Sequence, residues 1–251
     1  MKETAINAAK EAGRFLKERM GKIETINIKG KDDFVTDVDQ QAEKIIKNII
    51  TSAYPAHNIL AEESGHKNNH SDYTWIIDPL SSTTNYIHSL HLFSVAVAVL
   101  KDNKPIIGVV YDPLREEIFS AEKGKGAFLN NQKIIVSKVT TLNNSLICLT
   151  LKKKTNGEEE KSTTYFKKLF PLSTIKMMGS TAVHLCHIAC GRIEGFIETK
   201  SDIFATPAGK IILEEAGGSI TDSMGSEWTL DSKDCIATNG IIHNELLQVI
   251  K

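Results

Sequence analysis

The chain has 251 residues, of which 41% are hydrophobic and 24% charged, and its 30 Lys and Arg against 31 Asp and Glu give a formal charge of −1. These values exclude a disordered chain, and the balanced charge argues against a protein that mainly coats nucleic acid. At roughly 150 residues per domain, the length predicts one large domain or two small domains in close contact.

Membrane and secretory features are missing from the sequence. The longest apolar run, residues 92–100, is far shorter than the roughly 20 residues of a membrane-spanning helix. The first 20 residues carry charges at helical spacing, which is unlike a signal peptide. Four scattered cysteines are too few for a disulfide framework. We therefore expect a cytoplasmic protein with no membrane partner.

The first half of the chain is predicted to contain two helices followed by strands. Apolar residues form a loose stripe over residues 6–20 and a cleaner one over residues 42–53, at the three-and-four spacing of an amphipathic helix. From residue 58 the pattern is that of strands, and polar turns between the later ones predict an antiparallel meander. The predicted strands are 58–61, 75–77, 95–99, 106–110 and 117–121.

The second half alternates between helix and strand, which predicts mixed α/β layering. We expect residues 1–140 to carry the helices and the meander sheet, and residues 141–251 to form the mixed layer, packed together as one globular unit. The predicted elements are strands at 145–150, 174–178 and 194–198, and helices ending near 170, over 181–190 and over 207–216.

Three acidic segments lie at the ends of predicted elements, namely residues 33–39, 61–65 and 75–79. Carboxylates that follow strands can converge at one edge of a sheet, and Mg²⁺ prefers such oxygen ligands together with water and phosphate. Taken singly, each segment is better explained by helix caps and solvated turns. Only the combination of the three favours a metal site.

The order and spacing of six motifs are similar to those of the inositol monophosphatase family. The motifs are residues 33–39 (DFVTDVD), 61–64 (AEES), 75–85 (WIIDPLSSTTN), 124–128 (GKGAF), 179–182 (GSTA) and 214–218 (EEAGG). The resemblance covers nearly the whole chain and is closest to the bacterial extragenic-suppressor branch. It implies an α/β fold with αβαβα layers, a homodimer, and Mg²⁺-dependent hydrolysis of inositol or related polyol phosphomonoesters by an activated water.

The resemblance also implies roles for single residues. Glu62 and Asp78 resemble the ligands of the first magnesium ion, with the Leu80 carbonyl as a third ligand. Thr83 and Asp39 resemble the pair that orients and deprotonates the attacking water.

Phosphate and substrate are expected to lie between two regions of the chain. Backbone amides at the start of a helix near residue 82 would hold phosphate, because free N–H groups and the helix dipole converge there. The phosphate- and substrate-binding residues implied by the resemblance are Ser81, Ser82, Thr83, Gly179, Ser180, Thr181 and Glu198.

Two departures from the family pattern fall on one metal position. Ser81 stands where the family has a metal-ligating aspartate, and Ala205 stands at the aspartate of a later Trp-Asp pair. Ser82 also replaces a glycine that lets the backbone approach phosphate. The lost carboxylates belong to the second magnesium, half of a two-metal clamp on the displacement. We therefore expect at most one Mg²⁺ site and weak or absent phosphatase activity.

Compensation and function are left with alternatives. Asp202 could replace the missing ligand, but Thr206 and Pro207 look like a helix cap and a first-turn proline, which favours a solvated loop carboxylate instead. The chain is then a weakly active phosphatase of small polyol phosphates or a catalytically degenerate relative. The degenerate relative would bind a partner of the transcription or RNA machinery, as the bacterial branch suggests, or would act as a phosphate-ligand sensor.

A possible zinc cluster lies within one short stretch. Zinc sites usually gather ligands from more than one element, so buried cysteines and partly exposed histidines are the better interpretation. The residues are His184, Cys186, His187 and Cys190.

Overall fold

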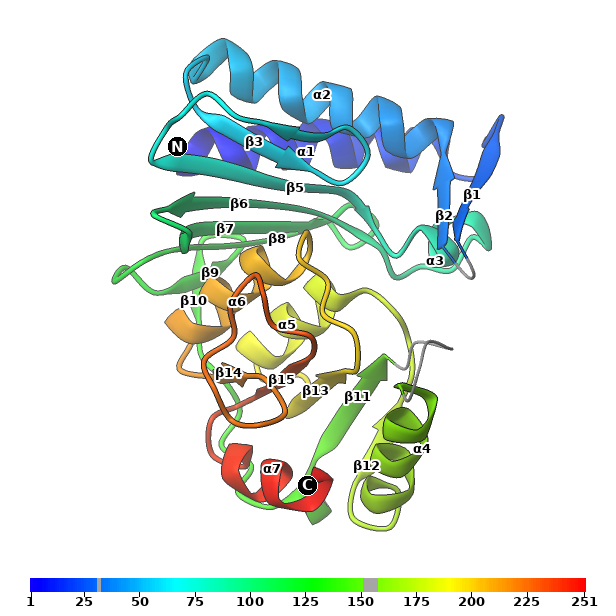
Figure 1. Ribbon diagram of the computed structural model, residues 1–251, viewed down its shortest axis with the longest axis vertical. Coiled ribbons are helices and arrows are strands. Elements are labelled where there is room, and N and C mark those ends of the chain that lie inside the picture. The colour runs from blue at the N-terminus through cyan, green and yellow to red at the C-terminus, as the bar shows by residue number, and fades with distance from the viewer. Residues whose placement is uncertain (31–32, 151–157) are drawn as a thin grey trace.

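A computed structural model describes residues 1–30, 33–150 and 158–251, and its elements stack in alternating layers (Figure 1). Two N-terminal helices cover one face of an eight-stranded sheet, and two central helices separate that sheet from a five-stranded one. Two further helices cover the far side of the smaller sheet. The predicted αβαβα arrangement is confirmed. No helix within the described ranges is long and apolar enough to cross a bilayer.

The two predicted N-terminal helices are α1 (Lys2–Arg19) and α2 (Asp37–Ala53). They pack on each other and on the large sheet. α2 begins at a capping box, because the Thr36 side chain accepts from the Asp39 amide while the Asp39 carboxylate accepts from the Thr36 amide. A short antiparallel pair that the sequence pattern did not predict, β1 (Ile26–Gly30) and β2 (Asp33–Thr36), joins the helices.

The large sheet has the order β10-β9-β8-β7-β6-β5-β3-β4. The predicted meander is confirmed from β6 to β8, while β5 pairs antiparallel with β6 and parallel with β3. A short helix, α3 (Thr83–Ile87), follows β5. The strands are β3 (Asn58–Ala61), β4 (Gly65–Lys67), β5 (Tyr73–Ser81), β6 (Ser94–Lys101), β7 (Lys104–Asp112), β8 (Glu117–Glu122), β9 (Ala127–Leu129) and β10 (Gln132–Ile134).

The second sheet has the order β12-β11-β13-β15-β14, with β12, β11 and β13 parallel and the other two pairings antiparallel. The predicted helix–strand alternation is confirmed, and β14, β15 and α7 are additions to it. The elements are β11 (Leu146–Thr150), α4 (Glu158–Leu169), β12 (Thr174–Lys176), α5 (Thr181–Ala189), β13 (Gly195–Glu198), α6 (Thr206–Glu215), β14 (Ser219–Thr221), β15 (Cys235–Thr238) and α7 (His243–Ile250), with a 3₁₀ turn at Leu142–Asn144.

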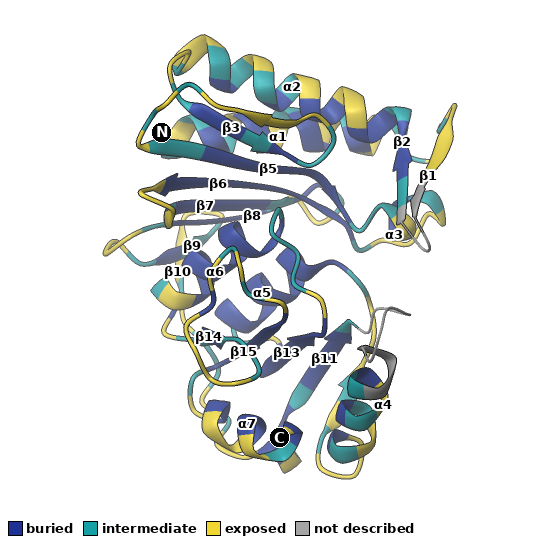
Figure 2. Cartoon of the chain, in the orientation of Figure 1, coloured by how far each residue is buried: buried dark blue, intermediate teal, exposed yellow. Residues whose placement is uncertain are grey.

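The central helices α5 and α6 are buried between the two sheets (Figure 2). All nine residues of α5 are buried, because the helix is covered on both sides. α6 approaches β7 closely at Gly108, where an added Cβ would lie 2.3 Å from the Ala208 carbonyl oxygen. One apolar cluster contains residues of both halves, such as Phe119 and Phe196, so the halves share a core.

Candidate active site

The pairing of β3 with β5 brings two predicted metal ligands together. Ala61 lies opposite Ile77 in this parallel pair, and Glu62 and Asp78 are the next residues along each strand. The Glu62 amide donates to the Ile77 carbonyl at 3.2 Å, which holds the end of β3 against β5. The sequence argument that carboxylates converge at one sheet edge is therefore borne out for this pair.

Asp78 is buried to 1% exposure and its charge is poorly solvated. Burial, and after it the charges of Glu62 and Asp202, raise the pKa of Asp78 well above its usual value. Hydrogen bonds from the Ser81 hydroxyl and the Leu80 amide act in the opposite direction. A buried carboxylate beside a second one needs a positive counter-charge. The predicted donor set of Glu62, Asp78 and the Leu80 carbonyl is therefore chemically suited to one hard divalent cation.

Asp39 and Thr83 meet beside these carboxylates. The Thr83 hydroxyl lies 3.0 Å from Asp39 Oδ1 and 3.2 Å from the Leu80 carbonyl oxygen. Asp39 is 1% exposed, and burial raises its pKa although hydrogen bonds from Thr36 and Thr83 oppose the shift. The Thr83 hydroxyl therefore links Asp39 to the end of β5, the strand that carries Asp78.

The predicted second metal position carries Ser81 and Ala205. Ser81 is 3% exposed, and its hydroxyl accepts from Ser180 Oγ at 3.4 Å in addition to bonding Asp78. Ala205 is fully buried in the apolar cluster between the sheets. Over the described ranges, no three His, Cys, Asp or Glu side chains are grouped closely enough to hold a metal ion. The two residues predicted at this position thus carry no carboxylate, although the Ser81 hydroxyl bonds the Asp78 carboxylate.

Asp202 is more than the solvated loop carboxylate expected from the sequence. Its Oδ1 accepts from the amides of Phe204 and Ala205, each at 3.0 Å, and so caps the turn that enters α6. The helix begins at Thr206 with Pro207 in its first turn, as predicted, but the cap is Ala205 rather than Thr206. The Asp202 charge raises the pKa of Asp78, so the two carboxylates are close enough to interact electrostatically.

The predicted substrate-side residues form a second group at the start of α5. Thr181 Oγ1 donates to Glu198 Oε1 at 2.8 Å, and the Asp202 amide donates to Glu198 Oε2 at 3.2 Å. Glu198 is the last residue of β13 and is 1% exposed. Ser180 and Gly179 both have positive φ angles, +63° and +80°, so the chain enters α5 through a tight left-handed turn.

The two groups of predicted residues meet across Gly179. A Cβ at this position would lie 2.9 Å from Ser82 Oγ and 3.0 Å from Asn85 Nδ2. Ser82 itself has φ +79°, a conformation that favours glycine. Asn85 belongs to the 75–85 motif, but its side chain bonds Met178, 93 residues away, so no local sequence pattern indicates its role.

The histidines of the supposed zinc stretch are buried rather than partly exposed. His184 is fully buried with its ring tilted against that of Phe196, the centroids 4.8 Å apart, and His187 is 9% exposed. Burial lowers the pKa of His184 to about 3 and that of His187 to about 4. Cys186 is buried in the apolar cluster that contains Phe196. These side chains fill the core between the sheets.

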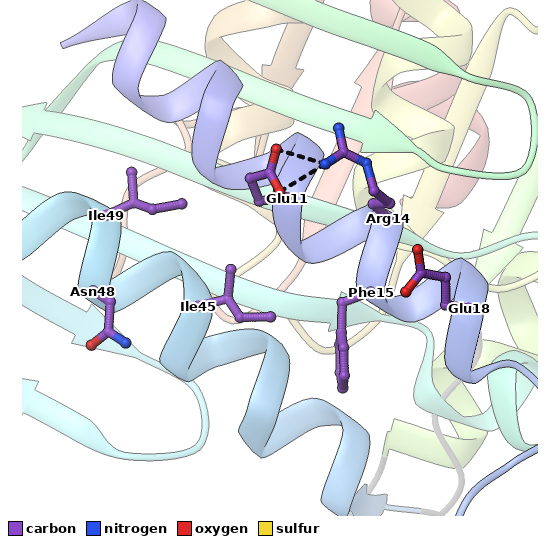
Figure 3. Close-up of a pocket in the computed structure, with 7 residues that line it drawn as sticks. All are labelled: Glu11, Arg14, Phe15, Glu18, Ile45, Asn48 and Ile49. Atoms are coloured by element: carbon purple, nitrogen blue, oxygen red, sulfur yellow. Dashed lines mark hydrogen bonds and ion pairs between the residues drawn. The ribbon is translucent and has the colours of Figure 1, made fainter.

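Two surface grooves lie apart from the carboxylates. One, of about 420 Å³, runs between α1 and α2 on the outside of the helical layer (Figure 3) and contains Phe15, Ile45 and an Arg14–Glu11 ion pair. The other, of about 570 Å³, runs beside Asn85 and Gly179. Neither is lined by Glu62 or Asp78.

Known proteins are similar to this chain in sequence and fold over almost its whole length. The profile of the inositol monophosphatase family matches residues 1–251. Inositol monophosphatase 2 of Solanum lycopersicum is 34% identical, covering 99% of this chain and 97% of that protein. Nus factor SuhB of Pasteurella multocida is also 34% identical, covering 100% and 96%. The structure of extragenic suppressor protein suhB from Bartonella henselae matches with a TM-score of 0.95 and 32% identity, covering 99% and 97%. Membership of the extragenic-suppressor branch stays a prediction, since a relative named inositol monophosphatase and a relative named SuhB are both 34% identical to the chain.

Proposed function

Because the chain belongs to the inositol monophosphatase family, we propose that it binds small polyol phosphates with one Mg²⁺ and hydrolyses them weakly or not at all. One observation carries this proposal. The second metal position holds the Ser81 hydroxyl and a buried Ala205 in place of two carboxylates. The family is Mg²⁺-dependent, so a neutral second position removes part of its catalytic apparatus.

The retained residues define what the chain can do with a phosphomonoester. Glu62, Asp78 and the Leu80 carbonyl would hold the ion, which when bound supplies Lewis-acid polarisation of a phosphoryl oxygen. The Thr83 hydroxyl donates to Asp39, and its oxygen lone pairs can then accept from a water. Burial makes Asp39 a stronger proton acceptor than an exposed aspartate, which suits a relay that removes a proton from water.

The remaining predicted residues would orient the substrate. Amides of Ser82 and Thr83 at the start of α3 would contact phosphate, and Ser81 lines the same turn. On the other side, Glu198 holds Thr181 in place through a buried hydrogen bond. Gly179, Ser180, Thr181 and Glu198 would thus face the substrate hydroxyls.

Weak turnover follows from the position of the missing charge. Developing charge on the leaving oxygen needs a cation or donor, and removing one such stabiliser typically costs about a hundred- to thousandfold in rate. Asp202 Oδ1 is engaged by two amides at the start of α6, and we infer that its other oxygen alone does not replace the two missing carboxylates, because the described residues hold no group of three His, Cys, Asp or Glu side chains.

A second candidate is a binding function without turnover. A relative 34% identical to the chain carries the name Nus factor SuhB, which favours a partner in the transcription or RNA machinery. A phosphate-ligand sensor would use the same retained residues. The assembly expected for either form is a homodimer in the cytoplasm.

The test compares phosphate release from inositol monophosphate by the natural protein and by the triple variant Ser81→Asp, Ser82→Gly, Ala205→Asp, over a Mg²⁺ series. We expect activity to rise at least about a hundredfold in the variant. Titration calorimetry with Mg²⁺ alone should show one ion per natural chain. Robust hydrolysis by the natural protein, or two bound ions, contradicts impaired catalysis.

A further inference from the structure

The candidate site depends on a contact between two segments that are far apart in sequence. The phosphate turn, residues 82–84, opens α3, and the substrate loop, residues 177–181, opens α5. Gly179 packs against Ser82 so closely that a Cβ there would lie 2.9 Å from Ser82 Oγ. The geometry of either segment therefore depends on the other.

The Asn85 side chain joins them. Its Nδ2 donates to the Met178 carbonyl at 2.8 Å and to the Leu92 carbonyl at 2.8 Å, and the residue is 8% exposed. Both partners are acceptors, so the amide NH₂ must face them and both of its protons are used. Asn85 thus ties α3, the chain after α3 and the substrate loop to one side chain.

We propose that Asn85 is a positioning residue that holds the substrate loop against the phosphate turn, in the form that receives the hydroxyls of a polyol phosphate. The ligand class rests on the proposed function above. The positioning itself does not, because it is carried by the two hydrogen bonds and the Gly179 contact.

The substrate loop needs such a restraint because its backbone is strained. Ser180 has φ +63°, a left-handed conformation that is unfavourable for a residue with a Cβ. Such conformations persist only where surrounding contacts fix them. Ser180 makes no side-chain cap bond to α5, so the bond from Asn85 to the preceding Met178 is one of the contacts that fix this turn.

Hydrogen exchange tests the restraint without requiring activity. In Asn85→Ala, the His184 amide, which donates to the Ser180 carbonyl of the substrate loop at 3.1 Å, should exchange at least about fivefold faster than in the natural protein. Asn239→Ala is the matched control, since Asn239 is also buried and its amide donates to carbonyls of Ser137 and Val139 away from the site. Unchanged exchange in Asn85→Ala, or equal acceleration in the control, overturns the proposal.

Gly179→Ala provides a second variant if Asn85→Ala does not fold. Its Cβ would lie 3.0 Å from Asn85 Nδ2, so it should push the loop away and give the same local acceleration. Protection of the loop in this variant at the natural level overturns the proposal as well.

Binding then connects the restraint to the ligand. With Mg²⁺ present, Asn85→Ala should weaken inositol monophosphate binding about tenfold more than inorganic phosphate binding, because only the polyol reaches the substrate loop. Equal losses for both ligands contradict the positioning role. If the natural protein binds neither ligand, the proposed function fails, and the exchange experiment alone decides the role of Asn85.

Discussion

Single residues at the second metal position explain most of the expected chemistry. Ser81 and Ala205 are neutral and buried. Adding a carboxylate at each would place two further acids near Asp78 in a poorly solvated site. We predict that Ser81→Asp, Ala205→Asp lowers the melting temperature without Mg²⁺, because buried like charges repel. Saturating Mg²⁺ should then stabilise the variant by about 2–3 kcal/mol more than the natural protein, since binding to the folded state raises stability.

Differential scanning fluorimetry with and without Mg²⁺ measures this difference. The single variant Ala205→Asp, which leaves Ser81 in place, is the control. A Mg²⁺ shift equal to that of the natural protein would show that the added carboxylates do not form a cation site.

Asp202 separates a charge effect from a capping effect. Asparagine keeps the Oδ1 acceptor for the amides of Phe204 and Ala205, whereas alanine removes it. We therefore expect Asp202→Ala to lower the free energy of unfolding by about 1 kcal/mol and Asp202→Asn by much less. Urea denaturation measures both values. Mg²⁺ affinity should change by less than about threefold in Asp202→Asn, and a tenfold loss would identify Asp202 as a metal ligand after all.

At the scale of elements, the two histidines of α5 make the stability of the folded protein depend on pH. The pKa values of His184 and His187 lie at about 3 and about 4, below the 6.5 of an exposed histidine, mainly because burial disfavours the imidazolium. Arg192 and Arg115 near His187 act in the same direction, and Glu117 and Asp112 oppose them. The unfolded chain takes up more protons below pH 6.5, so stability is full above that pH and declines toward pH 4.

The expected loss at pH 5 is about 2 kcal/mol for each of the two histidines. The raised pKa values of buried Asp78 and Asp39 act in the opposite direction, so the test compares variants: in urea denaturation at pH 7.5 and pH 5, His184→Leu should lose about 2 kcal/mol less than the natural protein. His66→Gln, at an exposed position, is the control. An unchanged pH dependence in His184→Leu would show that this histidine does not titrate with unfolding.

Elements with a clear period were predictable, and those fixed by distant contacts were not. α2 follows from its apolar stripe, and β5 to β8 from apolar runs separated by polar turns. β1 was missed because Ile26 and Ile28 are 48% and 74% exposed and give no buried alternation. At the site, the meeting of Glu62 with Asp78 follows from strand ends, whereas the roles of Asn85 and Asp202 depend on backbone partners that no local pattern specifies.

At the scale of the whole molecule, the two sheets are connected by the closely packed central helices α5 and α6. Gly108→Ala would place a Cβ 2.3 Å from the backbone oxygen of Ala208, so α6 must move away from β7. We predict a loss of about 2–3 kcal/mol in the free energy of unfolding, as for other overpacked cores. Gly13→Ala is the comparison, because its Cβ would meet the Tyr111 ring at 2.4 Å and Pro113 Cβ at 3.3 Å, which are side-chain atoms rather than backbone. Equal losses in urea denaturation would show that α6 is free to shift.

The parallel pairing of β3 with β5 has a consequence for how this chain tolerates changes in length. Successive side chains of a strand point to opposite faces, so inserting one residue in β5 before Asp78 would turn that carboxylate away from Glu62. Loops elsewhere on the surface absorb insertions at little cost. The predicted cation position therefore depends on which face of the strand each carboxylate points to as much as on residue type. We expect β3 and β5 to tolerate substitutions better than insertions.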